Sequence, residues 1–188
     1  PKKIESSFGK YVSFEADLSD LSSLGTFIKH ILSLHPDLNG LVSNAGYGKF
    51  GGLESFSANQ ISSFIDVNLV SHMIIAREII PYFKKGKRGD IILIGSEAAL
   101  QGSKQGSLYC AAKFGLRGFS QAIRDECAGR GIRVSLVNPG MVRTSFFKNL
   151  NFSPGDSPEN AIESEDVASV VMNIFSARAG TVIDEVNL

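Results

Sequence analysis

Short apolar runs alternate along the chain with longer stretches in which apolar residues recur with a helical period. The run from Ile91 to Ile94 has the length of a strand and is apolar on both faces. The pattern predicts strands at residues 11–14, 41–42, 89–95, 132–137 and 181–186. It predicts helices at residues 20–34, 57–83, 107–129 and 165–175. Strands that alternate with helices and are apolar on both faces indicate a parallel α/β sheet.

The first predicted helix shows the helical period most clearly. Its apolar stripe consists of Leu21, Leu24, Phe27, Ile28, Ile31 and Leu32. Asp17 or Ser19 is expected to cap it, because both side chains can accept a hydrogen bond from a free backbone N–H. Residues 144–164 are rich in Phe, Asn, Ser, Pro and Gly, which predicts a loop or lid. No repeat, linker or second domain is visible, so residues 1–188 are predicted to form one domain.

Composition narrows the possible partners. Of 188 residues, 43% are hydrophobic and 20% are charged, as expected for a soluble globular domain. Lysine plus arginine equals aspartate plus glutamate at 19 each, which argues against a nucleic-acid partner. No apolar run approaches the roughly 20 residues that cross a bilayer, so no membrane partner is expected. Cys110 and Cys127 are too few for a disulfide framework, which favours a cytoplasmic location.

Tyr109 and Lys113 lie four residues apart in a predicted helix and therefore on one face of it. Four tyrosines and 11 lysines would give one such spacing by chance about a quarter of the time, so an ordinary neighbour pair is the simpler interpretation. A lysine charge about 5 Å away would nevertheless favour the phenolate and lower the pKa of Tyr109 from about 10 toward about 8. A tyrosine tuned in this way is suited to general acid/base work.

Ser96 follows Gly95 where a predicted strand ends, and ligands bind outside the carboxyl ends of such strands. A serine in an ordinary strand-to-loop turn is an equally open interpretation. A nucleophilic serine is rejected, because its flanks are not G-x-S-x-G and all three histidines precede it. A hydrogen bond from Ser96 to a substrate carbonyl is the better role.

Asn68 interrupts the apolar stripe of the predicted helix 57–83. That stripe is formed by Ile61, Phe64, Ile65, His72, Ile75 and Ile79. A buried amide needs hydrogen-bond partners. Two interpretations stay open: a core asparagine tied to the neighbouring backbone, or one that binds backbone or water beside a catalytic site.

Residues 46–51 read G-x-G-x-x-G and follow a predicted strand. We reject them as a dinucleotide fingerprint, because that motif needs a helix that opens at the glycines and a second strand that ends at an acid. Here the helix starts near Ser57, and the acid at the right spacing, Asp66, lies inside it. The glycines are expected to let the backbone pass close to a flat ligand. Neither a metal-ligand spacing nor a Walker sequence is present.

Together these motifs resemble the short-chain dehydrogenase/reductase family along nearly the whole chain. The matching motifs are Asp17-Leu18, Ser43-Asn44-Ala45-Gly46, Asn68, Gly95-Ser96, Tyr109-x-x-x-Lys113 and Pro139-Gly140-Met141-Val142-Arg143-Thr144. The resemblance implies a Rossmann-type fold, with a doubly wound parallel sheet in three α/β/α layers. It also implies an oxidoreductase that transfers a hydride between a nicotinamide cofactor and an alcohol or ketone carbon. The implied cofactor is NAD or NADP, with NADP slightly favoured.

The family pattern also implies a role for each matching residue. Tyr109 would donate or take the proton, and Lys113 would hold the nicotinamide ribose and lower the pKa of the tyrosine. Ser96 would orient the substrate oxygen, and Asn68 would hold a water of the proton relay. The implied cofactor contacts are Asp17 and Leu18 at adenine, Asn44, Ala45 and Gly46 at adenosine and ribose, and Pro139, Gly140, Val142 and Thr144 at nicotinamide.

One part of the family pattern is not found in this sequence. The first strand, a glycine-rich turn T-G-x-x-x-G-x-G, a helix and a second strand are missing, so an incomplete sheet with an exposed edge is expected. We favour a real segment ahead of Pro1 over a natural remnant. The alternative function is a non-catalytic binding or scaffold module that has lost its affinity for the cofactor.

The expected partners are a small carbonyl or alcohol substrate and further copies of the chain. The predicted helices 57–83 and 107–129 carry more apolar surface than one buried face requires, which predicts a homodimer or homotetramer. The family resemblance points the same way. Two interpretations of Phe146, Phe147, Leu150 and Phe152 stay open: an apolar wall of the substrate pocket, or ordinary core packing. Leu100, Gln105 and the residues after Ser96 are expected to shape the same pocket.

Overall fold

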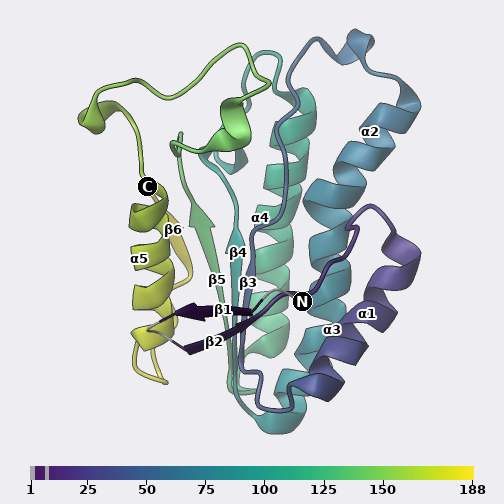
Figure 1. Ribbon diagram of the computed structural model, residues 1–188, viewed down its shortest axis with the longest axis vertical. Helices are drawn as coiled ribbons and strands as arrows, with labels where there is room; N and C mark the ends of the chain where they lie inside the picture. Colours follow the sequence, from purple (N-terminus) through teal and green to yellow (C-terminus); the bar gives the residue numbers. More distant parts are fainter. Residues whose placement is uncertain (1–2, 7–8) are drawn as a thin grey trace.

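The computed structural model describes residues 3–6 and 9–188 and shows a four-stranded parallel sheet (Figure 1). In their order across the sheet, the strands are β3 (Gly40–Ser43), β4 (Gly89–Ile94), β5 (Ile132–Asn138) and β6 (Glu185–Asn187). The helices are α1 (Leu21–Leu34), α2 (Ala58–Ile65), α3 (Ser71–Gly86), α4 (Ser107–Cys127) and α5 (Ser164–Ser176). Helices α1, α3 and α4 cover one face of the sheet and α5 covers the other. This confirms the predicted three-layer α/β/α arrangement.

Strand β4 lies inside the sheet, and its side chains alternate between two cores. Ile91 and Leu93 pack in the core that α1, α3 and α4 cover, whereas Ile92 and Ile94 pack in the core under α5. These four side chains are between 0% and 7% exposed. Each such burial is worth about 1.5–3 kcal/mol, which explains why the strand is apolar on both faces.

The sheet register aligns the ends of the two central strands. Ile94, the last residue of β4, pairs with Val137 of β5. The segments that follow, Gly95-Ser96 and Pro139-Gly140, therefore leave the sheet at the same carboxyl edge. Ligand sites of open α/β sheets form outside this edge.

The predicted helix 57–83 is one continuous helical path with a π-turn, η2 (Asp66–Val70), between α2 and α3. It starts with a capping box, in which the Ser57 hydroxyl accepts from the Gln60 N–H and the Gln60 side chain accepts from the Ser57 N–H. The π-turn holds one extra residue in its hydrogen-bonded ring and contains the fully buried Asn68.

The predicted strand 11–14 is wrong in its bounds, and it does not join the parallel sheet. Strand β2 (Gly9–Val12) pairs antiparallel with β1 (Lys3–Ser6) in a separate two-stranded sheet. The two short strands are close in sequence, so their backbone groups are satisfied locally. Strand β3 is left at the edge of the large sheet, where Val42 is 43% exposed. This agrees with the expected incomplete sheet.

The predicted cap of α1 also needs correction. Asp20 caps the helix by accepting a hydrogen bond from the Ser23 N–H at 3.3 Å. The Asp17 carboxylate instead accepts from the N–H and the hydroxyl of Ser19, which uses both predicted capping residues in the turn before the helix.

The last predicted strand, 181–186, is shorter and shifted to Glu185–Asn187. In the segment before this strand, arginine side chains donate hydrogen bonds to backbone carbonyl oxygens. Arg133 Nη1 donates to the Thr181 oxygen at 3.3 Å, and Arg124 Nη2 donates to the Asp184 oxygen at 2.8 Å.

Residues 144–163, called the 144–163 segment below, contain two short helical turns, η4 (Ser145–Phe147) and η5 (Pro158–Asn160). Arg143 joins the two ends of this segment. Its N–H donates to the Ile162 oxygen at 2.8 Å, and its Nη1 donates to Glu163 Oε1 at 2.6 Å. Its Nη2 donates to the Gly155 oxygen at 2.7 Å, so one side chain holds the base and the middle of the segment.

Candidate active site

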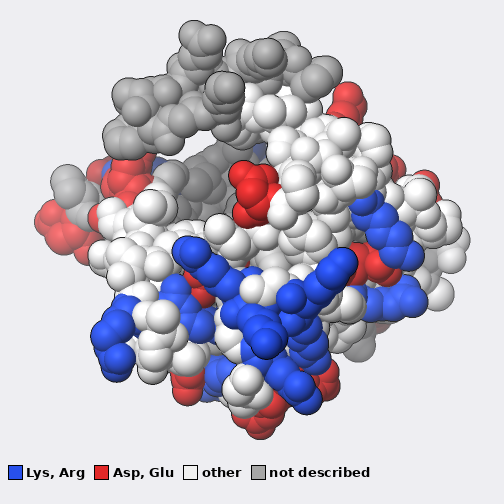
Figure 2. Space-filling view, turned by 90° about the horizontal axis from the view of Figure 1, so that it is seen from below, with Lys and Arg blue, Asp and Glu red and all other residues white. Residues whose placement is uncertain are grey.

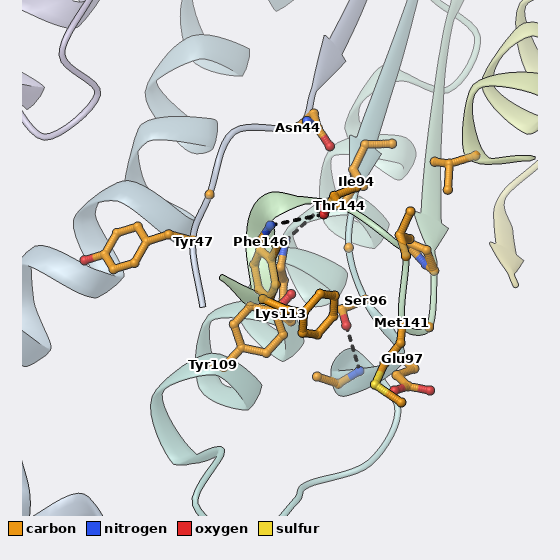
Figure 3. Close-up of a pocket in the computed structure, with 18 of the residues that line it drawn as sticks. Asn44, Tyr47, Ile94, Ser96, Glu97, Tyr109, Lys113, Met141, Thr144 and Phe146 are labelled. Carbon is orange, nitrogen blue, oxygen red and sulfur yellow. Dashed lines mark hydrogen bonds between the residues drawn. The ribbon is translucent and has the colours of Figure 1, made fainter. Parts of the chain in front are cut away.

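The carboxyl ends of β3, β4 and β5 open onto one large cavity of about 1320 Å³. Helix α4 and the 144–163 segment complete its walls. Asn68, Ser96, Tyr109 and Lys113 all line it, so the structure brings the four predicted catalytic residues to one site. Figure 3 shows Tyr109 and Lys113 projecting from the α4 ribbon beside Ser96.

Lys113 is held by the end of β4. Its side chain is 5% exposed, and its Nζ donates a hydrogen bond to the Ile94 carbonyl oxygen at 3.0 Å. The Nζ lies 5.8 Å from the centre of the Tyr109 ring. Burial lowers the pKa of Lys113 from 10.5 to about 8. The proposed cofactor-binding lysine is therefore fixed in place by the sheet.

The pKa of Tyr109 does not follow the sequence-based expectation. Burial raises it above the usual value of 10.0, and the hydrogen bond with the Ser96 side chain opposes that rise only in part. The predicted lowering by Lys113 is wrong for the chain by itself, because desolvation of the phenolate outweighs the favourable contacts. A buried phenol that keeps its proton is suited to act as a general acid.

Ser96 is presented by a turn that Asn138 supports. The Ser96 N–H donates to Asn138 Oδ1 at 3.2 Å, and Asn138 Nδ2 donates to Glu185 Oε1 at 2.9 Å and Asn187 Oδ1 at 3.0 Å. A Cβ on Gly95 would collide with Asn138 Oδ1, so the residue before the serine must be glycine. The sequence pattern did not indicate Asn138, although its place before Pro139-Gly140 at a strand end was a readable signal.

Asn68 ties the loop after β3 to the π-turn. Its Oδ1 accepts from the Tyr47 N–H at 3.0 Å, and its Nδ2 donates to the Phe64 oxygen at 3.0 Å. A Cβ on Gly46 would lie 2.7 Å from Asn68 Oδ1, so the loop can approach only because it has glycine there. Asn68 is thus bonded to neighbouring backbone and also lines the cavity, which fits both interpretations, and its role in holding a water stays a prediction.

Behind the cavity, His72 and Ser43 form a buried pair. Ser43 Oγ lies 2.6 Å from His72 Nδ1, and His72 is 1% exposed. Burial, and then the charge of Lys113, lower the pKa of His72 from 6.5 to about 4. The imidazole is therefore neutral at physiological pH.

The predicted cofactor residues fall into two groups. Those that line the cavity are Asn44, Gly46, Pro139, Gly140, Val142 and Thr144. Ala45 is not part of the lining. Asp17 lines a separate hollow against α1, and Leu18 packs against the main core. The structure thus assembles the four positions implied at nicotinamide and two of the three implied at adenosine and ribose, and it leaves Asp17 and Leu18 outside this cavity.

The assembled residues fit the nicotinamide end of a dinucleotide. The cavity is larger than the usual 300–1,000 Å³ of ligand pockets, and so offers room for a cofactor end and a substrate. Gly46 and Gly140 leave its backbone without side chains, Lys113 is its buried cation, and hydroxyl groups come from Ser96 and Thr144. This mixture suits a polar ring and a ribose.

The sequence pattern did not indicate Phe50 as a site residue, whereas Glu97 is one of the residues after Ser96 that were expected to shape the pocket. Phe50 lies in the glycine-rich stretch 46–51, and its ring centre is 5.2 Å from that of Tyr109. Glu97 directly follows Ser96 and lines the same cavity. The fold alone brings Phe50 to Tyr109.

Within residues 3–6 and 9–188, no group of His, Cys, Asp or Glu side chains is arranged to hold a metal ion. None of the helices in the same ranges is long and apolar enough to cross a membrane. Both cysteines, Cys110 and Cys127, are free and buried.

Comparison with known families agrees with the geometry of the site. The pattern of the short chain dehydrogenase family matches residues 1–154. The chain belongs to the short chain dehydrogenase family. This confirms the resemblance, the Rossmann-type fold class and the reaction class, that of an NAD(P)-dependent dehydrogenase or reductase.

The sequences of individual family members match most of this chain. It is 27% identical over 173 residues to the sepiapterin reductase of Chlorobaculum tepidum, a match that covers 92% of this chain and 70% of the relative. It is 30% identical over 152 residues to the 3-ketodihydrosphingosine reductase of Bacteroides thetaiotaomicron, covering 81% of this chain and 56% of that protein. The chain thus spans little more than half of that second relative.

A solved structure shares both sequence and fold. The crystal structure of a metagenomic short-chain oxidoreductase in complex with NADP superposes with a TM-score of 0.79 at 31% identity. The match covers 94% of this chain and 73% of that one.

Proposed function

We propose that the whole protein interconverts an alcohol and a ketone with NAD or NADP, using Tyr109 as the general acid/base. The observation that supports this best is the meeting of Ser96, Tyr109 and Lys113 in one cavity, from the end of β4 and from α4. The NADP in the related crystal structure supports the choice of a nicotinamide cofactor.

When bound, the nicotinamide supplies or accepts the hydride. In the direction of reduction, the Ser96 hydroxyl donates a hydrogen bond to the carbonyl oxygen and fixes its place. Tyr109 then transfers its phenolic proton to that oxygen as negative charge develops there. In the direction of oxidation, Tyr109 takes the proton from the hydroxyl group.

The environment of Tyr109 supports both directions once a cofactor is present. Burial keeps the phenol protonated, which suits reduction. Lys113, whose pKa of about 8 leaves it mostly protonated at neutral pH, would hold the ribose and provide positive charge beside the phenolate left by proton transfer. Asn68, Asn44, Gly46, Pro139, Gly140, Val142 and Thr144 would shape the cofactor end of the cavity.

The test is cofactor turnover, followed by nicotinamide absorbance, in the whole protein and its Tyr109→Phe variant. Loss of the phenolic proton should lower kcat about 10²–10⁴-fold while NADP still binds. Undiminished turnover in Tyr109→Phe would remove the proposed mechanism.

A binding or scaffold module is the second candidate. The position of Asp17 outside the cavity favours it, because a predicted adenine contact is not joined to the nicotinamide end. Calorimetric titration of this 188-residue chain with NADH and NADPH separates the two candidates. Clear binding of NADH or NADPH would contradict the scaffold module, which is defined by lost affinity for the cofactor.

We also propose a cytoplasmic homodimer or homotetramer. Free, buried cysteines are compatible with a reducing compartment. Phe114 on α4 is an exposed aromatic residue, as expected at an interface between copies. Light scattering should give a mass of at least twice one chain, and Phe114→Asp should lower it to that of one chain. A monomeric mass for the unaltered protein would contradict this proposal.

A further inference from the structure

Four phenylalanine rings meet beside Tyr109, and we call Phe50, Phe146, Phe147 and Phe152 the aromatic wall. Phe50 and Phe146 contact the Tyr109 ring, with centre-to-centre distances of 5.2 Å and 5.9 Å. Phe152 packs on Phe50 at 4.9 Å and on Phe147 at 5.7 Å. All four rings line the cavity, so the reacting tyrosine faces an aromatic surface.

The glycine-rich stretch 46–51 carries Phe50 to Tyr109 and also supports the ring of Phe146. A Cβ on Gly48 would lie 2.6 Å from Phe146 Cζ, so the glycine lets the Phe146 ring pack against the loop backbone. The Gly51 N–H donates to the Gln105 oxygen at 2.8 Å and anchors the far end of the loop. The stretch therefore helps to form a substrate wall, which gives its glycines a purpose other than binding phosphate.

Glu97 directly follows Ser96 and lines the same cavity. Figure 3 shows Ser96 between Tyr109 and Phe146 on one side and Glu97 on the other. The Glu97 N–H donates to the Pro139 oxygen at 3.0 Å, which fixes the backbone that carries the carboxylate. Oε2 would lie 3.3 Å from a Cβ on Gly140, so the carboxylate borders the bare backbone at that strand end.

The charges around the cavity are few. Among the described lining residues, Glu97 is the one acid, and the cations are Lys104 and Lys113. Lys113 is buried and directed to the Ile94 oxygen, whereas Lys104 lies on the exposed loop before α4. A substrate held between Ser96 and Tyr109 would thus meet rings on one side and a carboxylate on the other.

We propose that the substrate is a ketone or alcohol with an aryl group toward the aromatic wall and an ammonium group toward Glu97. The inference rests on the proposed function and adds Phe50 and Glu97 as specificity-determining residues. An aryl group gains from offset or edge contacts with the phenyl rings. A carboxylate attracts an ammonium group and repels an anionic one.

Four ketones test separately the preference for an aryl group and the preference for an ammonium group. β-Aminopropiophenone has both groups, butyrophenone has the aryl group alone, β-aminoethyl methyl ketone has the ammonium group alone, and methyl propyl ketone has neither. Turnover gives kcat/KM for each in the whole protein with NADPH. Calorimetric titration in the presence of NADP gives their affinities without any reaction.

Each substitution should affect one preference. Phe50→Ala should lower the preference for aryl over methyl about tenfold and leave the preference for ammonium unchanged. Glu97→Gln should lower the preference for ammonium about fivefold and leave the preference for aryl unchanged. Added salt should weaken the ammonium preference alone. Phe14→Ala and Glu126→Gln, which change a ring and an acid outside the cavity lining, should alter neither preference.

Other outcomes would overturn the inference. Equal kcat/KM for the four ketones would do so while leaving the proposed reaction intact. A preference for β-benzoylpropionate over β-aminopropiophenone would also do so, because it would show that Lys104 outweighs Glu97. If affinities follow the expected pattern but no ketone is turned over, the substrate class stands and the proposed reaction fails.

Discussion

Lys113 Nζ donates a 3.0 Å hydrogen bond to the carbonyl oxygen of Ile94, the last residue of β4. This bond fixes a lysine of α4 to the end of the strand that leads into Ser96. A buried amine therefore links the helix that carries Tyr109 and Lys113 to the strand end beside Ser96. The protonation of that amine has consequences that can be measured.

The first prediction concerns Lys113 and alkaline pH. Its pKa is about 8 in the folded chain against 10.5 in the unfolded chain, so between these values the unfolded chain binds more protons and stability rises with pH. We expect the free energy of unfolding of the unaltered protein, minus that of Lys113→Met, to rise by at most about 3 kcal/mol over this range. Urea unfolding at a series of pH values measures it. A constant difference would show that burial does not perturb the lysine.

His72 should make the chain sensitive to acid. Its pKa is about 4 when folded and 6.5 when unfolded, so its contribution is complete above pH 6.5 and is lost as the pH falls toward 4. The loss should reach at most about 3 kcal/mol and be absent in His72→Gln. Denaturant unfolding from pH 7 to pH 4 is the measurement, with the exposed His30→Gln as control. An equal acid loss in His72→Gln would assign the effect to carboxylates.

The contact between Gly46 and Asn68 predicts non-additive mutations. Gly46→Ala places a Cβ 2.7 Å from Asn68 Oδ1 and should cost about 1–3 kcal/mol of stability. Asn68→Ala leaves the Tyr47 N–H and the Phe64 oxygen without this partner and should cost about 1–3 kcal/mol. The double variant should cost less than the sum by about 1 kcal/mol or more, because its clash is gone. Simple additivity in the unfolding cycle would mean that the loop moves aside.

Arg143 should control the order of the 144–163 segment. Arg143→Ala removes its bonds to Glu163 and to the Gly155 oxygen, so the aromatic wall should open more often. We expect chymotrypsin to cut after Phe146 or Phe152 several-fold faster and KM to rise more than kcat falls. Lys148→Ala, an exposed change in the same segment, is the control. Equal cleavage of both variants would show that the clamp does not hold the segment.

Hydrophobic period was sufficient to predict the central elements. The run Ile91 to Ile94 is buried as its pattern predicts. The stripe of the first helix packs on the core through Leu24 and Ile28, which are buried, and through Phe27, Ile31 and Leu32, which are partly buried. The strand at residues 11–14 failed because alternation in sequence does not name a pairing partner. The π-turn was not visible because hydrogen-bond register inside a helix leaves the apolar spacing nearly unchanged.

The sequence was sufficient to predict which residues form the candidate site, but not how their surroundings change their pKa values. Ser96, Tyr109 and Lys113 could be selected from spacing and strand ends, and the fold brings them together. The direction of the Tyr109 pKa shift could not be obtained in this way, because it depends on water excluded by distant parts of the chain. Phe50 comes to Tyr109 from 59 positions away in sequence, which no local pattern encodes.

The π-turn Asp66–Val70 gives this helix one residue more than an ordinary helix needs between the same two ends. Removing one residue from the turn would restore ordinary helical hydrogen bonds and leave the buried His72 and Ile79 on the core face. Removing one residue from the first turn of α3 would instead rotate every later position by about 100° about the helix axis and take Ile79 out of the core. Single-residue deletions at residues 66–70 should therefore be tolerated far better than deletions in α3, so the π-turn is a place where this helix can change its length without moving the residues that follow.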